Sequence, residues 1–173
     1  MNRLMLALIT LMTLLGLGVL TGEHSLALGD ELTVEKLKNA EYQVRYGKVK
    51  LTDGLFENSD QNAHFHSVEW PNKVAFGDLN GDGVADAAAI LWSFVGASGT
   101  LVDLVAIVNQ NGHPKQVARI ELGNKVEVES LSIRSGQIVM EIVRHTPDDP
   151  QCCPSNDVTE KYRLSGKNLV LAP

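Results

Sequence analysis

The chain has 173 residues and a formal net charge of −6, because 21 Asp and Glu outnumber 15 Lys and Arg. It contains no block rich in Lys and Arg, so nucleic acid and anionic membrane surfaces are poor candidate partners. The composition therefore favours a mildly acidic, soluble protein of the cell envelope or the surrounding medium.

The N-terminus has the three parts of a secretory signal peptide. Met1–Arg3 supplies a positive charge, residues 4–20 form an uncharged apolar run, and Ser25–Ala27 offers the small residues that a signal peptidase reads. This pattern predicts cleavage after Ala27, with residues 1–27 removed, and so a periplasmic or secreted protein. The alternative is an uncleaved membrane anchor, since the apolar run is at the short limit of the roughly 17–25 residues that span a bilayer.

Residues 28–173 are predicted to form a single domain, close to the usual size of roughly 100–150 residues. The first predicted element is a short helix that begins after Thr33, a residue suited to the N-cap position. Leu32, Leu37 and Ala40 would give this helix one apolar side.

The stretch 41–51 alternates polar and apolar residues, which is typical of a strand, and the parity changes at Gly47. This change predicts a bulge or bend within the strand. Asp53 and Gly54 predict a tight turn. Residues 58–72 are polar and irregular, which indicates a loop with room for one short strand around Phe65.

The second half of the chain alternates turn signals with β-prone runs. The predicted strands cover residues 87–95, 100–108, 116–122, 126–133, 137–144 and 158–164, with a last strand through Val170. The run 87–95 is apolar on both parities, so we expect a central strand that is covered on both faces. A parity change near Ser130 predicts a second bulge. The predicted fold is mainly β: an antiparallel meander forming a curled sheet or small barrel-like sandwich, with one short N-terminal helix.

The stretch DLNGDGVAD spaces its oxygen-bearing side chains as in the calcium-loop pattern Asp-x-Asp/Asn-x-Asp-Gly. Calcium takes about 6–8 oxygen ligands, and alternate residues of a tightly curved loop point to one centre. The predicted ligands are Asp78, Asn80, Asp82, the carbonyl of Val84, and Asp86. Ala89 stands where a calcium-sensing helix-loop-helix has a bidentate Glu, so we expect a structural calcium ion between strands. The alternative is a surface turn built from residues that favour turns.

The only two cysteines, Cys152 and Cys153, are sequence neighbours. Their Cα atoms lie about 3.8 Å apart, whereas disulfides usually span roughly 4.4–6.8 Å. In an oxidising compartment we favour a vicinal disulfide that rigidifies its loop. A redox switch or a ligand-stacking surface is the more specific possibility, and two free thiols or an intermolecular link is the alternative.

Two histidines, His64 and His66, would lie on the same side of an extended segment. With Glu69, or with His113 or His145, they would suit a zinc or copper ion. Exposed loop histidines without a ligand are the alternative.

Several motifs together resemble a family of uncharacterised bacterial secreted or periplasmic domains. They are LKNAEYQV, KVKLTDGLF, GDLNGDGVADAAAIL, LVAIVNQNGHPKQVA, VEVESLSIRSGQIVMEIV and PDDPQCCPS. The most specific combination is the DLNGDGxxD loop with the C-terminal DPxCCP element. The resemblance implies an envelope location and a shared scaffold, and it implies no particular activity.

The sequence predicts no catalytic residues. We expect a calcium-stabilised β-domain that acts as a non-catalytic binding or interaction module of the cell envelope, with an unidentified envelope protein or ligand as its partner. The alternative is a redox-active or transition-metal-handling envelope protein that uses Cys152, Cys153 and histidines.

Overall fold

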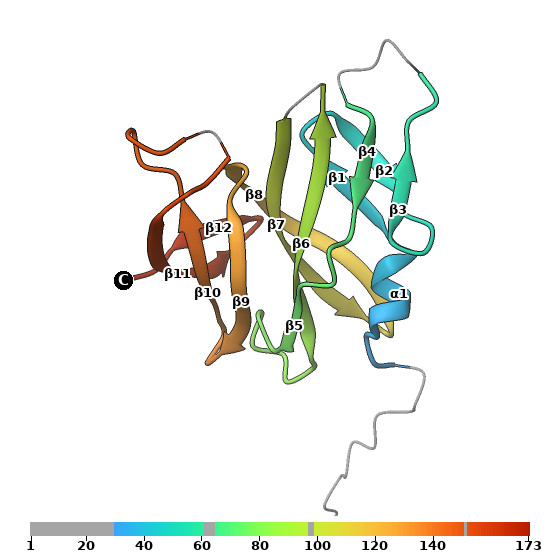
Figure 1. Ribbon diagram of the computed structural model, residues 1–173. Helices are drawn as coiled ribbons and strands as arrows, with labels where there is room; N and C mark the ends of the chain where they lie inside the picture. The colour runs from blue at the N-terminus through green and yellow to red at the C-terminus, as the bar shows by residue number, and fades with distance from the viewer. Residues whose placement is uncertain (1–29, 61–64, 97–98, 151) are drawn as a thin grey trace, which may run out of the picture.

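The computed structural model describes residues 30–60, 65–96, 99–150 and 152–173. The predicted signal peptide (1–27) and His64 lie outside these ranges. The described chain forms one short helix and twelve strands (Figure 1). The elements are α1 (Val34–Lys38), β1 (Glu41–Val44), β2 (Gly47–Lys50), β3 (Leu55–Glu57), β4 (Ser67–Glu69), β5 (Val74–Gly77), β6 (Asp86–Val95), β7 (Gly99–Gln110), β8 (His113–Asn124), β9 (Glu127–Arg134), β10 (Gln137–Arg144), β11 (Asn156–Ser165) and β12 (Asn168–Leu171).

The strands form three layers, which lie side by side in Figure 1. The central sheet has the order β3-β4-β6-β7-β8, with β5 also paired to β6. The C-terminal sheet, β12-β11-β10-β9, covers one face of it, and α1 with the β1–β2 hairpin covers the other. All strand pairs are antiparallel, and neither large sheet closes into a barrel. The mainly β, antiparallel prediction is therefore confirmed.

Strand β6 is buried on both faces, as its sequence predicts. Ala87, Ala89 and Leu91 pack into the core beneath α1 and the β1–β2 hairpin. Ala88 and Ile90 point the other way, into the core beneath the C-terminal sheet. All five side chains are fully buried. Because β6 contributes to both cores, it joins the three layers.

The helix begins where the sequence predicts. The hydroxyl of Thr33 accepts a hydrogen bond from the backbone N–H of Lys36 at 3.2 Å, which satisfies one of the open donors of the first turn. The predicted apolar side, Leu32, Leu37 and Ala40, is buried.

The predicted single bent strand over residues 41–51 is wrong. Val44 pairs with Gly47, so the chain reverses there and forms the two strands of a hairpin. Gly47 has φ +137°, a conformation that glycine adopts at little cost. The parity change thus marks a turn between two strands. The predicted Asp53–Gly54 turn is confirmed, since both residues have positive φ and Thr52 bridges Leu55.

The sequence misses one local feature of the sheets, strand β5, and predicts another, the bulge in β9. Strand β5 pairs with the first half of β6 and is missed, because four residues give too short a pattern. The bulge near Ser130 is confirmed, since Ser130 pairs with Glu141 whereas Val128 pairs with the next residue, Ile142.

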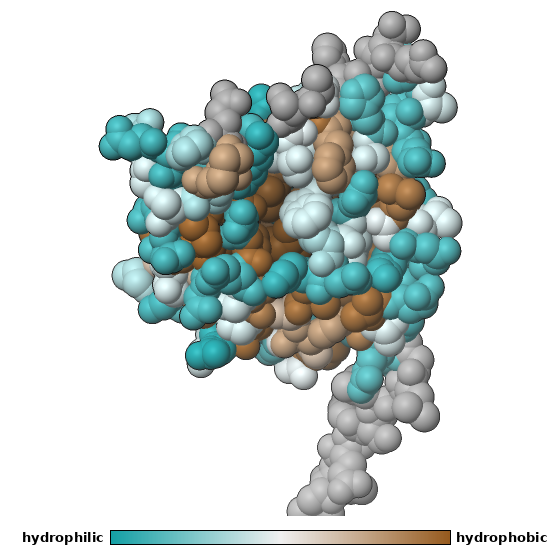
Figure 2. Space-filling view, in the orientation of Figure 1, coloured by the Kyte–Doolittle hydropathy of each residue, from teal (hydrophilic) through white to brown (hydrophobic). Residues whose placement is uncertain are grey.

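Polar side chains cover much of the face shown in Figure 2, and apolar side chains are visible in a hollow between the C-terminal sheet and the central sheet. In the described segments, no helix is long and apolar enough to cross a membrane.

The two sheets approach closely where β5 meets β9. A Cβ atom added at Gly77 would lie 2.7 Å from Cγ2 of Ile133, well inside normal contact distance. We expect Gly77→Ala to reduce the free energy of unfolding by roughly 1–3 kcal/mol, the usual cost of overpacking. Denaturant unfolding of Gly77→Ala, Ile133→Ala and the double variant tests this. The double variant should lose less than the sum of the single losses, and strictly additive losses would contradict the contact.

Candidate functional site

The Asp loop, residues 78–86, connects β5 to β6. The carboxylate of Asp78 accepts backbone N–H groups from Gly81 at 2.6 Å, Gly83 at 2.9 Å and Asn80 at 3.2 Å. The N–H groups of Gly81 and Gly83, which favour the charged form, lower the pKa of Asp78 below its usual value. Gly81 and Gly83 both have φ near +84°, where glycine is strongly preferred.

The next two polar side chains of the loop repeat the same kind of contact. Asn80 Oδ1 accepts the backbone N–H of Asp82 at 2.8 Å, and Asp82 Oδ1 accepts that of Val84 at 2.8 Å. The amide of Asn80 also donates to Asp82 Oδ2 at 2.8 Å. The loop is therefore a series of turns that its own side chains stabilise.

Asp86 differs from the other loop residues because it is fully buried at the start of β6. Its two carboxylate oxygens accept the backbone N–H groups of Leu79 at 3.0 Å and Asn109 at 2.9 Å. Burial raises the pKa of Asp86, the two N–H groups oppose this, and the charges of Asp82 and Asp78 raise it further. One side chain thus ties the Asp loop to the end of β7.

The residue types of the Asp loop suit a calcium ion. A carboxylate oxygen has two lone pairs, so one N–H contact leaves room for a metal bond. However, within the described residues no three His, Cys, Asp or Glu side chains come together as a metal-holding group. The amide of Asn80 also faces Asp82 Oδ2, and a cation bound there would have to displace it. Calcium at Asp78, Asn80, Asp82, Val84 and Asp86 therefore stays a prediction.

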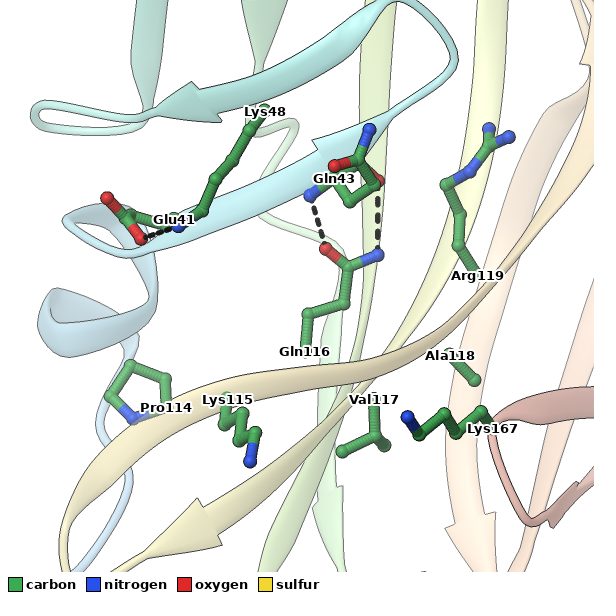
Figure 3. Close-up of a pocket in the computed structure, with 10 residues that line it drawn as sticks. All are labelled: Glu41, Gln43, Lys48, Pro114, Lys115, Gln116, Val117, Ala118, Arg119 and Lys167. Atoms are coloured by element: carbon green, nitrogen blue, oxygen red, sulfur yellow. Dashed lines mark hydrogen bonds and ion pairs between the residues drawn. The ribbon is translucent and has the colours of Figure 1, made fainter.

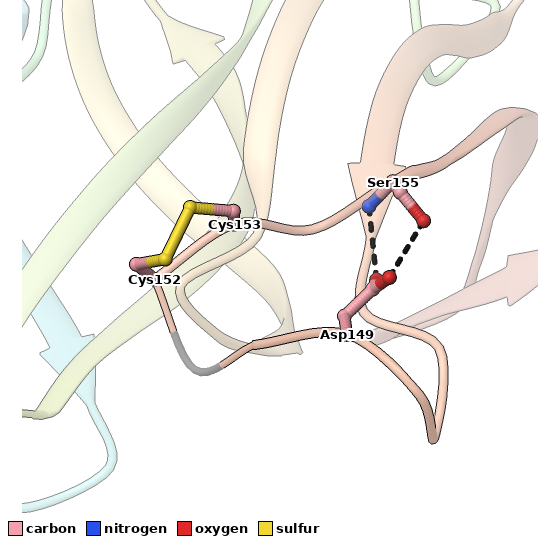
Figure 4. The surroundings of a disulfide bond; sticks show 4 residues. All are labelled: Asp149, Cys152, Cys153 and Ser155. Carbon is pink, nitrogen blue, oxygen red and sulfur yellow. Dashed lines mark hydrogen bonds between the residues drawn. A yellow bond between two sulfur atoms is a disulfide. The ribbon is translucent and has the colours of Figure 1, made fainter.

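Cys152 and Cys153 form the predicted vicinal disulfide, with sulfur atoms 2.28 Å apart (Figure 4). Both residues are exposed in the loop between β10 and β11. Asp149 braces this loop by accepting the backbone N–H of Thr146 at 2.8 Å and both the N–H and the hydroxyl of Ser155, at 2.9 and 2.7 Å. The hydroxyl of Ser155 and the N–H of Thr146 lower the pKa of Asp149 to about 2.

The described histidines are spread over the fold. His66 precedes β4, His113 begins β8, and His145 follows β10. Among the residues that the structure describes, they do not join Cys, Asp or Glu in a metal-holding group. His64 lies outside the described residues, so the predicted zinc or copper site stays untested.

A groove along β8, lined also by the β1–β2 hairpin and by the turn between β11 and β12, is not predicted by the sequence, and we call it the basic groove. Its cavity volume is about 420 Å³, and it is lined by Glu41, Gln43, Lys48, Pro114, Lys115, Gln116, Val117, Ala118, Arg119 and Lys167 (Figure 3). Gln116 crosses the gap: its amide accepts the N–H of Gln43 at 2.6 Å and donates to the C=O of Gln43 at 3.1 Å. The side chain thus connects two strands that do not pair directly.

Arg119 is held at this groove by a buried carboxylate. Asp103 on β7 is fully buried and accepts Arg119 Nη1 at 2.5 Å through Oδ1, whereas its Oδ2 has no hydrogen-bond partner. Glu121 lies 3.9 Å from the same Arg119 nitrogen and also binds Arg45 at 2.8 Å. Burial raises the pKa of Asp103 to about 6, against the opposing effect of Arg119. A lone Asp in the apolar run LVDLVAIV was the available sequence signal.

No protein-family model matches this chain, and neither the curated proteins nor the solved structures include one that matches it.

Asp86→Asn should destabilise the protein, because an amide can accept from only one of the two backbone N–H groups, of Leu79 and Asn109. A buried donor left without a partner costs about 1–3 kcal/mol. Chemical unfolding in the presence of a chelator separates this effect from any metal. Asp82→Asn, at an exposed position of the same loop, is the control and should cost less. Equal losses would show that Asp86 is not the main anchor of the loop.

Asp103 should make stability depend on pH. Its pKa is about 6 in the folded protein against a usual value of 3.8. Between these two pH values the folded protein keeps a proton on Asp103 that the unfolded chain releases. The contribution of Asp103 to stability is therefore greatest below pH 4 and falls as the pH rises through 6, by about 3 kcal/mol. Asp103→Asn removes this titration. The difference in unfolding free energy between wild type and variant, measured from pH 4 to pH 8, should follow that curve, and a difference independent of pH would contradict it.

Proposed function

We propose that this protein is a secreted or periplasmic, calcium-stabilised β-domain that acts as a non-catalytic binding module of the cell envelope. The observation that carries the proposal is the buried carboxylate of Asp86, which lies near the charges of Asp82 and Asp78. Burial and the charges of Asp82 and Asp78 all disfavour the charged form of Asp86. A divalent cation would offset both the burial of Asp86 and the repulsion among the three groups.

The chemistry of the loop favours a structural role over catalysis. A general acid or base works best when its pKa is near the working pH. The N–H groups of Gly81 and Gly83 instead lower the pKa of Asp78, and both oxygens of Asp86 hold backbone N–H groups. These carboxylates organise the backbone. Extracellular calcium sites bind with dissociation constants of roughly 10⁻⁴–10⁻³ M, which suits a loop of this kind in a calcium-rich medium.

Calcium should raise the melting temperature of the chelator-treated protein. A ligand at about 100 times its dissociation constant adds about 2.7 kcal/mol to stability, which corresponds to several degrees in a domain of this size. Differential scanning fluorimetry with calcium, magnesium and chelator measures the shift.

Asp82→Asn removes the negative charge of one predicted ligand and should reduce the calcium shift, whereas Glu127→Gln, an exposed acidic position on β9, should leave it unchanged. The absence of any shift in the wild-type protein would reject the calcium proposal. An equal shift in both variants would place the ion elsewhere.

A redox-active or transition-metal-handling role is the second candidate, and the exposed Cys152–Cys153 disulfide favours it. Thiol titration should find no free thiol in the native protein and two after mild reduction. Copper or zinc should bind the reduced protein and not the Cys152→Ser/Cys153→Ser variant. Failure of the reduced protein to take up either metal, together with no reaction of the disulfide under mild reduction, would remove this candidate.

A further inference from the structure

Four cationic side chains from three separate parts of the chain surround the basic groove. Lys48 lies on β2, Lys115 and Arg119 lie on β8, and Lys167 lies in the turn between β11 and β12. Glu41 is the one acidic residue among the ten that line the groove. The groove is thus a positively charged region in a chain whose net charge is −6.

Two of these four cations already have partners. Lys48 forms an ion pair with Glu41 at 2.5 Å, and Arg119 is held by the buried Asp103. In the described part of the chain, neither the side chain of Lys115 nor that of Lys167 has a hydrogen bond or an ion pair. These two lysines are therefore the groups available to an external anion.

The two lysines flank an apolar side chain, that of Val117. Figure 3 shows Lys115 and Lys167 on either side of Val117, whereas Gln116 projects from β8 toward β1. Val117 is partly buried against the core beneath the C-terminal sheet, so its position is held by packing. Pro114 and Ala118 add further apolar surface to the lining.

The volume of the groove matches a small molecule. Ligand pockets usually measure roughly 300–1,000 Å³ and combine apolar walls with a few polar groups that orient the ligand. At about 420 Å³ the basic groove is near the lower end of that range. An inorganic anion alone would leave the surface of Val117 and Pro114 without a contact.

We propose that the basic groove binds a small organic anion, whose phosphate or carboxylate group lies between Lys115 and Lys167 and whose carbon skeleton contacts Val117. This inference rests on the binding role proposed above and gives it a ligand class. A free solute suits the groove better than a membrane, because the net charge of −6 repels an anionic lipid surface.

Calorimetric titration of the full mature chain at low salt with butyl phosphate and with inorganic phosphate tests the proposal. Butyl phosphate should bind more tightly than inorganic phosphate, because only butyl phosphate offers a carbon chain to Val117. The double variant Lys115→Gln/Lys167→Gln should weaken butyl phosphate binding at least about tenfold, since hydrogen bonds to charged groups contribute about 1.5–3 kcal/mol each. Both lysines are exposed, so the variant should fold normally.

The matched control is Lys161→Gln/Arg163→Gln, which removes the same charge from two exposed positions of β11 outside the groove. This control should bind butyl phosphate like the wild type. Equal weakening in the two double variants, or no binding of either probe to the wild type, would overturn the proposal.

Vesicles of phosphatidylcholine with and without phosphatidylglycerol distinguish the source of the anion. Lysine-dependent binding to the anionic vesicles, without binding of free butyl phosphate, would overturn the small-ligand proposal and assign the groove to a lipid headgroup. All titrations are run with calcium and with chelator. Because the groove variants keep every predicted calcium ligand, failure of anion binding and failure of calcium binding are separate results.

Discussion

The burial of β6 on both faces is the constraint on which the rest of the structure depends. A strand with apolar side chains on both parities must be covered on both sides, and this chain covers it with α1 and a hairpin on one side and a four-stranded sheet on the other. The small side chains of Ala87 and Ala89 lie in one core, and that of Ala88 lies in the other. Both outer layers pack against cores to which this strand contributes.

Two buried carboxylates lie beside the apolar part of β6. At the start of β6, Asp86 takes up two backbone N–H groups that would otherwise lack partners. On the neighbouring strand β7, Asp103 is buried with Arg119 as its partner and with one oxygen unsatisfied. The first carboxylate closes the Asp loop, and the second holds one wall of the basic groove. Both are buried carboxylates whose burial is costly: Asp86 connects the Asp loop to β7, and Asp103 connects β7 to β8.

Features that depend on neighbouring residues were well predicted from the sequence. The helix cap at Thr33, the Asp53–Gly54 turn, the bulge near Ser130 and the long strands β6 to β10 all follow from local patterns. The vicinal disulfide, which the sequence favours on the assumption of an oxidising compartment, is also present. Short elements were predicted less well: β5 was missed, and the change of parity at Gly47 was interpreted as a bend although it marks a hairpin turn. A pattern of four residues is too short to reveal a strand such as β5, or to distinguish a bend within a strand from a hairpin turn.

By itself, the sequence determined the β-rich class, the doubly covered strand and the oxygen-rich loop, because each rests on residue spacing within one segment. Only the tertiary structure decided which side chains meet across segments. It brought Lys167 to the groove that Lys115 lines, placed Arg119 on the buried Asp103, and made Gln116 the link between β8 and β1. The physical reason is that such contacts depend on how the sheets stack and on strand register, and the spacing of residues along one strand contains neither.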